Sequence, residues 1–290
     1  MIAGQVNPAA AVSNPYQRHK TTTLIPSLAA YSFRDYFATV KGKVNEKIKA
    51  EDAMDMKAFI QYCAQQQVAA ELTSYFFDSD VENAYLTECR REAHLNGVAI
   101  AGTAVGNQFT LDPASENGKE QMQYVKTWID RAVLMGAPHV RVFAGRIPKG
   151  MSESEAEKNA TVALRTAGEY AAEKGVFLGI ENHDSIGSAE KLINIVTSVE
   201  NPWVGVNLDS GNFRTEDPYA DFAECVPYAV NIQIKEEIKI GDEKHETDFP
   251  KLFDSIKAGG YSGHVVLEFE GKGDPNEKVP PLLDEIKRNI

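Results

Sequence analysis

Four polar side chains stand at the ends of short apolar segments in the second half of the chain; they are Glu181, Asp209, Gln233 and Glu268. Side chains of a strand alternate between its two faces, so when the apolar residues of each segment face outward, these four point to the opposite face. Three carboxylates that converge on one point repel each other and are costly to desolvate. A bound divalent cation resolves that conflict, and we therefore expect metal-ion chemistry here.

The expected ligand set consists of oxygen atoms alone. Glu181, Asp209 and Glu268 offer carboxylates, and Gln233 offers a neutral carbonyl oxygen. Such a set favours one Mn²⁺ or Mg²⁺ ion, with Co²⁺ as a further option, over metals that prefer thiolate or imidazole. We expect the ion to lie roughly 2.0–2.3 Å from its four ligands.

Two neighbouring residues share the phase of these ligands and could contact a substrate. His183 follows Glu181 by two positions and could bind a hydroxyl group, with an ordinary structural histidine as the alternative. Lys235 could neutralise an oxyanion. An ion pair of Lys235 with Glu71 or Glu270 is the competing interpretation.

Residues around the earlier strands are weaker candidates. Arg141 and Arg146 lie near the end of the expected fourth strand, where salt bridges are favoured over substrate binding. Tyr31 and Tyr75 lie near the ends of the first two expected strands. They could form an apolar wall for a sugar, although packing in the barrel is the simpler explanation.

The segments that must position these residues alternate between strand-like and helix-like patterns. Most of the helix-like stretches end in a glycine, as a left-handed helix C-terminus would require. Eight such units predict an α/β protein with one (β/α)8 TIM barrel rather than a doubly wound sheet. The expected strands span residues 28–33, 69–73, 98–103, 139–143, 176–181, 204–209, 230–235 and 264–269.

The active sites of TIM barrels lie at the C-terminal ends of the strands, which is where the four polar side chains would meet. No change of composition marks a second domain, so we assign residues 27–290 to one barrel and residues 1–26 to an N-terminal tail. The tail lacks the apolar core of a signal peptide. It could be disordered, or it could begin a mature exported protein whose signal has been removed.

Composition narrows the range of partners. The 290 residues carry a formal net charge of −12 and contain no run of basic residues, which disfavours nucleic acid and anionic membranes. No apolar stretch approaches the length of a membrane-spanning helix. Cys63, Cys89 and Cys225 are widely separated and show neither zinc-ligand spacing nor a disulfide framework. The remaining partner class is a small molecule.

Four segments resemble a known family. They are GIENH (179–183), NLDSGN (207–212), NIQIK (231–235) and GYSGHVVLEFEG (260–271). These segments are similar to the xylose isomerase-like TIM barrels, and the resemblance extends over about residues 28–271. That superfamily includes sugar-phosphate isomerases and epimerases, ketose 3-epimerases, hydroxypyruvate isomerase, inosose dehydratase and endonuclease IV-type enzymes. The resemblance implies a carbohydrate substrate.

The resemblance also implies roles for individual residues. The family's metal ligands correspond to Glu181, Asp209, Gln233 and Glu268, and its two catalytic bases to Glu181 and Glu268. Many relatives have histidine where this chain has Gln233, whereas hydroxypyruvate isomerases have glutamine. Asn212 is a candidate substrate contact, and it replaces a histidine that is common in ketose 3-epimerases. The pocket of those epimerases therefore does not transfer directly.

The implied reaction begins with removal of a proton α to a carbonyl, through a metal-stabilised enediolate. Return of the proton to the neighbouring carbon gives isomerisation, and return to the opposite face gives epimerisation. Loss of a β-substituent would instead make the protein a lyase or dehydratase acting on inososes or 3-keto-glycosides. A metal-dependent phosphodiesterase is disfavoured because the chain has only six histidines. A sugar-binding barrel without catalysis is a further alternative.

Overall fold

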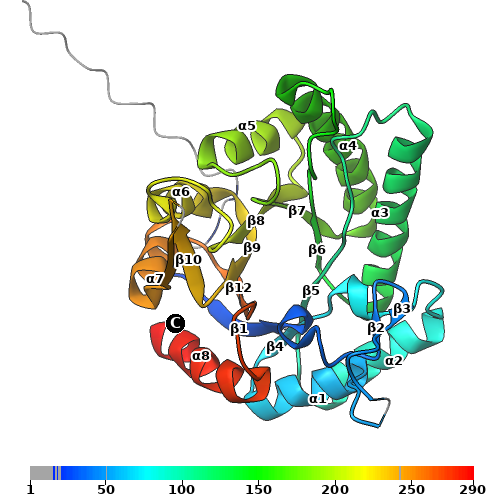
Figure 1. The fold of residues 1–290 in the computed structure, drawn as a ribbon, viewed down its shortest axis with the longest axis vertical. Coiled ribbons are helices and arrows are strands. Elements are labelled where there is room, and N and C mark those ends of the chain that lie inside the picture. Colours follow the sequence, from blue (N-terminus) through cyan, green and yellow to red (C-terminus); the bar gives the residue numbers. More distant parts are fainter. Residues whose placement is uncertain (1–15, 17, 19–20, 50, 242) are drawn as a thin grey trace, which may run out of the picture.

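A computed structural model describes residues 16, 18, 21–49, 51–241 and 243–290. In this part of the chain, eight parallel strands close into a barrel in the order β1-β12-β9-β8-β7-β6-β5-β4 (Figure 1). The predicted single TIM barrel is therefore confirmed. The barrel strands are β1 (Leu24–Ala29), β4 (Ala69–Glu71), β5 (Ile100–Ala104), β6 (His139–Val142), β7 (Phe177–Glu181), β8 (Val204–Asp209), β9 (Ala229–Ile234) and β12 (Gly263–Leu267).

Helices form a ring around the barrel (Figure 1). They are α1 (Met56–Gln66), α2 (Asn83–Leu95), α3 (Glu116–Met135), α4 (Glu153–Lys174), α5 (Ala189–Val199), α6 (Pro218–Cys225), α7 (Phe249–Ala258) and α8 (Pro275–Asn289). Short 3-10 helices occupy Ala30–Phe33, Ser74–Phe76 and Val226–Tyr228. Two small hairpins, β2–β3 (Thr39–Val40 and Lys43–Val44) and β10–β11 (Glu237–Ile240 and Glu243–Glu246), lie outside the barrel sheet. None of the helices that the structure describes has the length and hydropathy needed to span a lipid bilayer.

The first strand lies four residues earlier than the sequence indicated. We expected a strand over residues 28–33, but β1 spans Leu24–Ala29 and a 3-10 turn follows it. The whole run from Leu24 to Phe33 is mostly apolar, so its pattern does not mark where the strand ends. Pairing with β12, which begins at Leu24 and Gly263, decides the position. Most of the expected tail, residues 1–26, lies outside the described residues.

Local signals predicted the helix ends unevenly. Ser152 begins a Ser-x-x-Glu sequence, the pattern of a capping box, and caps α4 by accepting a hydrogen bond from the backbone N–H of Glu155. The same pattern at Ser79 does not begin a helix, since α2 begins at Asn83. Gly136 and Gly175 adopt the left-handed conformation expected after α3 and α4.

The inside of the barrel differs from its outer face. Outward-facing residues such as Leu178, Val206 and Ile232 are fully buried in the core between strands and helices. A small apolar layer of Ala29, Ala101 and Val266 lies apart from that core. Polar side chains occupy most of the remaining interior positions, so the barrel axis is mainly a polar environment.

His139 is buried on β6, and two glycines make room for its ring. A Cβ atom added at Gly102 would lie 2.9 Å from His139 Nδ1, and one added at Gly179 would lie 2.3 Å from His139 Nε2. Neither ring nitrogen has a hydrogen-bond partner among the described residues. Burial, followed by the nearby charge of Arg141, lowers the pKa of His139 to about 3, so the ring is neutral in the folded protein.

The first prediction tests this packing. Gly179→Ala should lower the free energy of unfolding by about 1–3 kcal/mol, because the added methyl group overlaps the His139 ring. Gly187→Ala is the matched control, since its Cβ would come no closer than 3.4 Å to the nearest side chain, Arg214. Urea unfolding of both variants measures the difference. Equal stability of the two variants would contradict the proposed steric conflict.

The second prediction concerns acid stability. The unfolded chain binds a proton at His139 below about pH 6.5, whereas the folded protein does so only near pH 3. Stability is therefore lost as the pH falls from 6.5 toward 3. When the pH falls from 7.5 to 5, the free energy of unfolding of the wild type should decrease by about 2 kcal/mol more than that of His139→Gln. In this range the folded protein leaves the His139 ring unprotonated, because its pKa is about 3, whereas the unfolded chain binds a proton there. Denaturant titrations at both pH values measure this, and parallel losses would show that His139 does not control acid stability.

Candidate active site

The barrel brings the four expected ligands to the C-terminal end of its strands. Glu181 is the last residue of β7 and Asp209 the last of β8, while Glu268 directly follows β12. Asp209 is paired in register with Gln233 of β9. All four side chains are buried.

Two buried cations lie among these acidic groups. Arg141 Nε lies 2.9 Å from Glu181 Oε2. Lys235 Nζ lies 3.2 Å from Asp209 Oδ2 and 3.4 Å from Glu268 Oε2. The lysine also lies 3.2 Å from Glu270 Oε1, the alternative partner considered from the sequence. The favoured interpretation of Arg141 as a salt-bridge residue is thus correct, but its partner is a predicted base.

Asn212 links the Arg141–Glu181 pair to Lys235. Its side-chain nitrogen donates to Glu181 Oε1 at 2.8 Å, and its oxygen accepts from Lys235 Nζ at 3.4 Å. Asp209 is oriented separately, because its Oδ1 accepts a 2.8 Å hydrogen bond from the backbone N–H of Gly211. The NLDSGN segment therefore holds both an acidic residue and the partner of another acidic residue.

Beneath the carboxylates, three amide side chains form a connected network with Glu71. Asn231 donates to Asn207 at 2.8 Å, and Asn207 donates to Gln233 Oε1 at 2.6 Å. Gln233 Nε2 then donates to Glu71 Oε1 at 3.0 Å and to Glu268 Oε1 at 3.3 Å. Asn231 also donates to Glu71 Oε2 at 3.3 Å. From the sequence, Glu71 was expected only as a possible partner of Lys235. Its place as the last residue of β4, with a side chain that faces the barrel interior, indicates a larger role.

Burial changes the protonation of this cluster. It raises the pKa of Glu71 to about 8, with the charge of Glu268 adding to the effect. Burial also raises the pKa of Asp209 to about 6 and that of Glu268 to about 7, while the nearby Lys235 charge opposes both shifts. The pKa of Lys235 would be lowered by burial alone, but its acidic neighbours raise it well above the usual value. The acidic neighbours therefore favour the protonated form of Lys235.

His183 lies at the edge of the site. Its ring packs against Phe143 with centroids 4.5 Å apart, and its Nδ1 lies 3.1 Å from Asp184 Oδ2. Its side chain remains 37% exposed, which leaves it accessible to a ligand. Arg146 forms a salt bridge to Asp184 at 3.1 Å, the role that its sequence context favoured.

A cavity of about 160 Å³ lies over these groups. Aromatic, acidic and basic side chains line it: Tyr31, Lys41, Tyr75, Arg141, Phe143, Glu181, His183, Lys235, Glu268 and Glu270. A larger cavity, of about 960 Å³, shares Tyr31, Lys41 and Tyr75 with it and extends along the β2–β3 hairpin. The two tyrosines thus stand where the inner and outer cavities meet.

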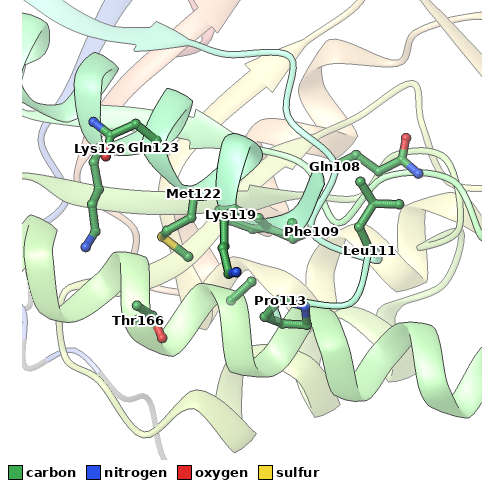
Figure 2. A pocket seen from close by; sticks show the side chains of 11 residues that line it. Gln108, Phe109, Leu111, Pro113, Lys119, Met122, Gln123, Lys126 and Thr166 are labelled. Atoms are coloured by element: carbon green, nitrogen blue, oxygen red, sulfur yellow. The ribbon is translucent and has the colours of Figure 1, made fainter. Parts of the chain in front are cut away.

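A separate cavity of about 210 Å³ lies on the outer ring, between α3 and α4 (Figure 2). Its walls include Phe109, Met122 and Thr166. None of the residues predicted from the sequence to bind metal or substrate lines it. We therefore place the candidate active site at the axial cavity.

The residues at the axial cavity do not fit a divalent metal as they are arranged. Among the described residues, no group of three or more histidine, cysteine or acidic side chains is placed to hold a metal ion. Lys235 Nζ lies within contact of both Asp209 and Glu268. Gln233 turns its NH₂ group, and not its carbonyl oxygen, toward Glu268. Metal binding by the four expected ligands stays a prediction.

Comparison with known families identifies the class of protein. The family described as xylose isomerase-like TIM barrel matches residues 59–288. The chain therefore belongs to this family, and the resemblance found in its last four strands is confirmed. Among curated proteins, none matches the chain.

Solved structures of the same fold include sugar epimerases. D-psicose 3-epimerase from Clostridium cellulolyticum H10 is 15% identical, with a TM-score of 0.67 over 90% of this chain and 89% of that one. The 3-keto-D-glucoside 4-epimerase from E. coli is 14% identical, with a TM-score of 0.63 over 93% and 99%. A xylose isomerase domain protein from Planctomyces limnophilus is 12% identical, with a TM-score of 0.66 over 93% and 98%. At these identities the likeness concerns the fold.

Proposed function

We propose that this protein is an enzyme that isomerises or epimerises a sugar or a similar small hydroxycarbonyl compound by removing a proton α to the carbonyl. The observation that carries the proposal is that two buried glutamates, Glu181 and Glu268, line one cavity. They belong to β7 and to the end of β12, which are separated in the barrel by β8 and β9. They therefore reach a ligand from different directions.

Each glutamate is held in place by its neighbours. Arg141 and Asn212 each contact one oxygen of Glu181, which orients the carboxylate. Burial raises the pKa of Glu181, and the charge of Arg141 opposes that shift. Gln233 and Lys235 contact the two oxygens of Glu268. One glutamate would accept the α-proton and the other would return a proton, at typical gains of about 10²–10⁴-fold for each general acid–base group. The point of return decides between isomer and epimer.

A divalent metal remains part of the sequence-based hypothesis. When bound by Glu181, Asp209, Gln233 and Glu268, it would polarise the substrate carbonyl. Because the side chains as arranged do not fit such an ion, we assign no step of the reaction to it. Proton transfer between substrate and the two glutamates requires only groups that line the cavity.

Elimination from a 3-keto-glycoside is the second candidate. The observation that favours it is the outer cavity of about 960 Å³, which joins the inner one at Tyr31, Lys41 and Tyr75 and offers space for a second sugar or an aglycone. The same α-proton would be removed, and the glycosidic oxygen would leave from the β-carbon with its electron pair. Only this reaction releases a free aglycone.

The decisive experiment is incubation of the protein in D₂O with ketoses, 3-keto-glycosides and inososes, with and without added Mn²⁺. Deuterium incorporation at a carbon next to the carbonyl, followed by NMR, would support α-proton abstraction and identify the substrate class. Chromatography of the products separates an epimer or isomer from an unsaturated sugar. Saturable binding of a sugar without any exchange would instead indicate a non-catalytic barrel.

The third prediction concerns the two glutamates. Glu181→Gln and Glu268→Gln should each lower the rate of α-proton exchange by about 10²–10⁴-fold, because the amide keeps the shape of the side chain but cannot accept the proton. Glu243→Gln provides the charge-matched comparison, and we expect a loss of less than about tenfold because Glu243 lies on β11, outside the cavity, with a side chain that is 84% exposed. Thermal unfolding checks that the variants fold. Wild-type exchange in either of the first two variants would show that the residue is not a base.

A further inference from the structure

The ammonium group of Lys235 lies among the four residues expected to bind a metal. Lys235 is 7% exposed, and its ammonium group contacts Asp209, Glu268 and Glu270. An ion bound to Asp209 Oδ2 and Glu268 Oε2 at about 2.0–2.3 Å would lie within about 6 Å of this ammonium group. Like charges at that distance in a buried site repel strongly.

The backbone leaves space for the lysine in this position. A Cβ atom at Gly211 would lie 2.7 Å from Lys235 Cδ and 3.2 Å from Lys235 Cβ. The stem of the lysine therefore runs directly over Gly211, and a larger residue there would push the ammonium group out of its contacts. The position of Lys235 is thus determined by close packing as well as by charge.

Gln233 is oriented against metal binding by the amide network. Its carbonyl oxygen accepts from Asn207, whose own oxygen accepts from Asn231. Turning the amide of Gln233 around would place its NH₂ group against the NH₂ group of Asn207. Reversing the whole network would in turn remove the two hydrogen bonds that Glu71 accepts.

Arg141 completes the arrangement on the other side of the cavity. Its guanidinium group lies 4.0 Å from the centre of the Phe143 ring and pairs with Glu181 at 2.9 Å. Both cations line the same cavity as the two proposed bases. The chain's own side chains therefore supply both proton acceptors and positive charge to this cavity.

From these contacts we propose that Lys235 and Arg141 supply the positive charge at this site, and that Glu181, Asp209, Gln233 and Glu268 do not bind a divalent cation in the native protein. The chemical role of the two cations rests on the proposed function. When a glutamate takes the α-proton, the electron pair of the C–H bond forms the C=C bond of the enediolate. The carbonyl oxygen then carries the negative charge, which Lys235 and Arg141 stabilise until a proton returns to carbon.

The fourth prediction is the test of metal exclusion, and it does not depend on activity. Chelator-treated wild-type protein titrated with Mn²⁺ should leave the EPR signal of free Mn²⁺ undiminished. The double variant Lys235→Met with Gln233→His removes the competing cation and introduces imidazole, so it should bind one Mn²⁺ per chain. Stoichiometric binding by the wild type that is lost in Asp209→Asn would overturn the proposal. Failure of the correctly folded double variant to bind would show that Lys235 is not what excludes the ion.

The catalytic role is tested separately, with a substrate identified in the D₂O experiment. A chelator should leave the rate of α-proton exchange by the wild type unchanged. Lys235→Met should lower that rate by about 10²–10³-fold, as is typical when one charge-stabilising donor is removed. Lys235→Arg should recover part of the loss. Chelation that abolishes exchange would contradict the proposed role of the cations. Absence of exchange with every substrate would count against the proposed function and leave the Mn²⁺ titration to decide the question of metal exclusion.

Discussion

The contact of Lys235 with three acidic side chains is the interaction on which the rest of the site depends. Carboxylates buried at the axis of a barrel lose their hydration and repel each other, so they persist only when donors or cations accompany them. Lys235 forms ion pairs with Asp209, Glu268 and Glu270, and Arg141 forms one with Glu181. Removing either cation would leave buried acidic groups uncompensated.

The amide network has a related effect one layer deeper. Glu71 is fully buried and receives hydrogen bonds from Gln233 and Asn231, which satisfy both of its oxygens. Because Gln233 also donates to Glu268, the deeper layer determines how a proposed base is oriented. The barrel interior therefore contains a hydrogen-bonded group of amides and Glu71 beneath the charged side chains that border the cavity.

Residues at equivalent positions in one family need not have the same role. Glu181, Asp209, Gln233 and Glu268 occupy the positions that the family resemblance assigned to metal ligands. In this chain Arg141 contacts Glu181, and Lys235 contacts both Asp209 and Glu268. Position alone therefore does not establish a metal site; the charge and orientation of the neighbouring side chains must agree with it.

Much of the architecture follows from local sequence patterns. Alternation of apolar residues in the segments before Glu181 and Asp209 predicted that these acids face the barrel axis, and the strands observed there end at those residues. A single chain segment carries that information, since the period of a strand is two residues. The start of β1 could not be predicted in the same way, because its apolar run extends beyond the strand.

Contacts between residues that are far apart along the chain depend on how the barrel closes. Gln233 donates a hydrogen bond to Glu71, which lies 162 positions earlier in the chain. Arg141 pairs with Glu181 of the neighbouring strand. No local sequence pattern specifies either contact. Such pairs form when the barrel closes and its register sets which inward side chains share a level. Alternation along each strand is enough to predict which residue types point inward. Barrel closure determined which of them meet, and hence that fixed cations border the carboxylates where a metal ion was expected.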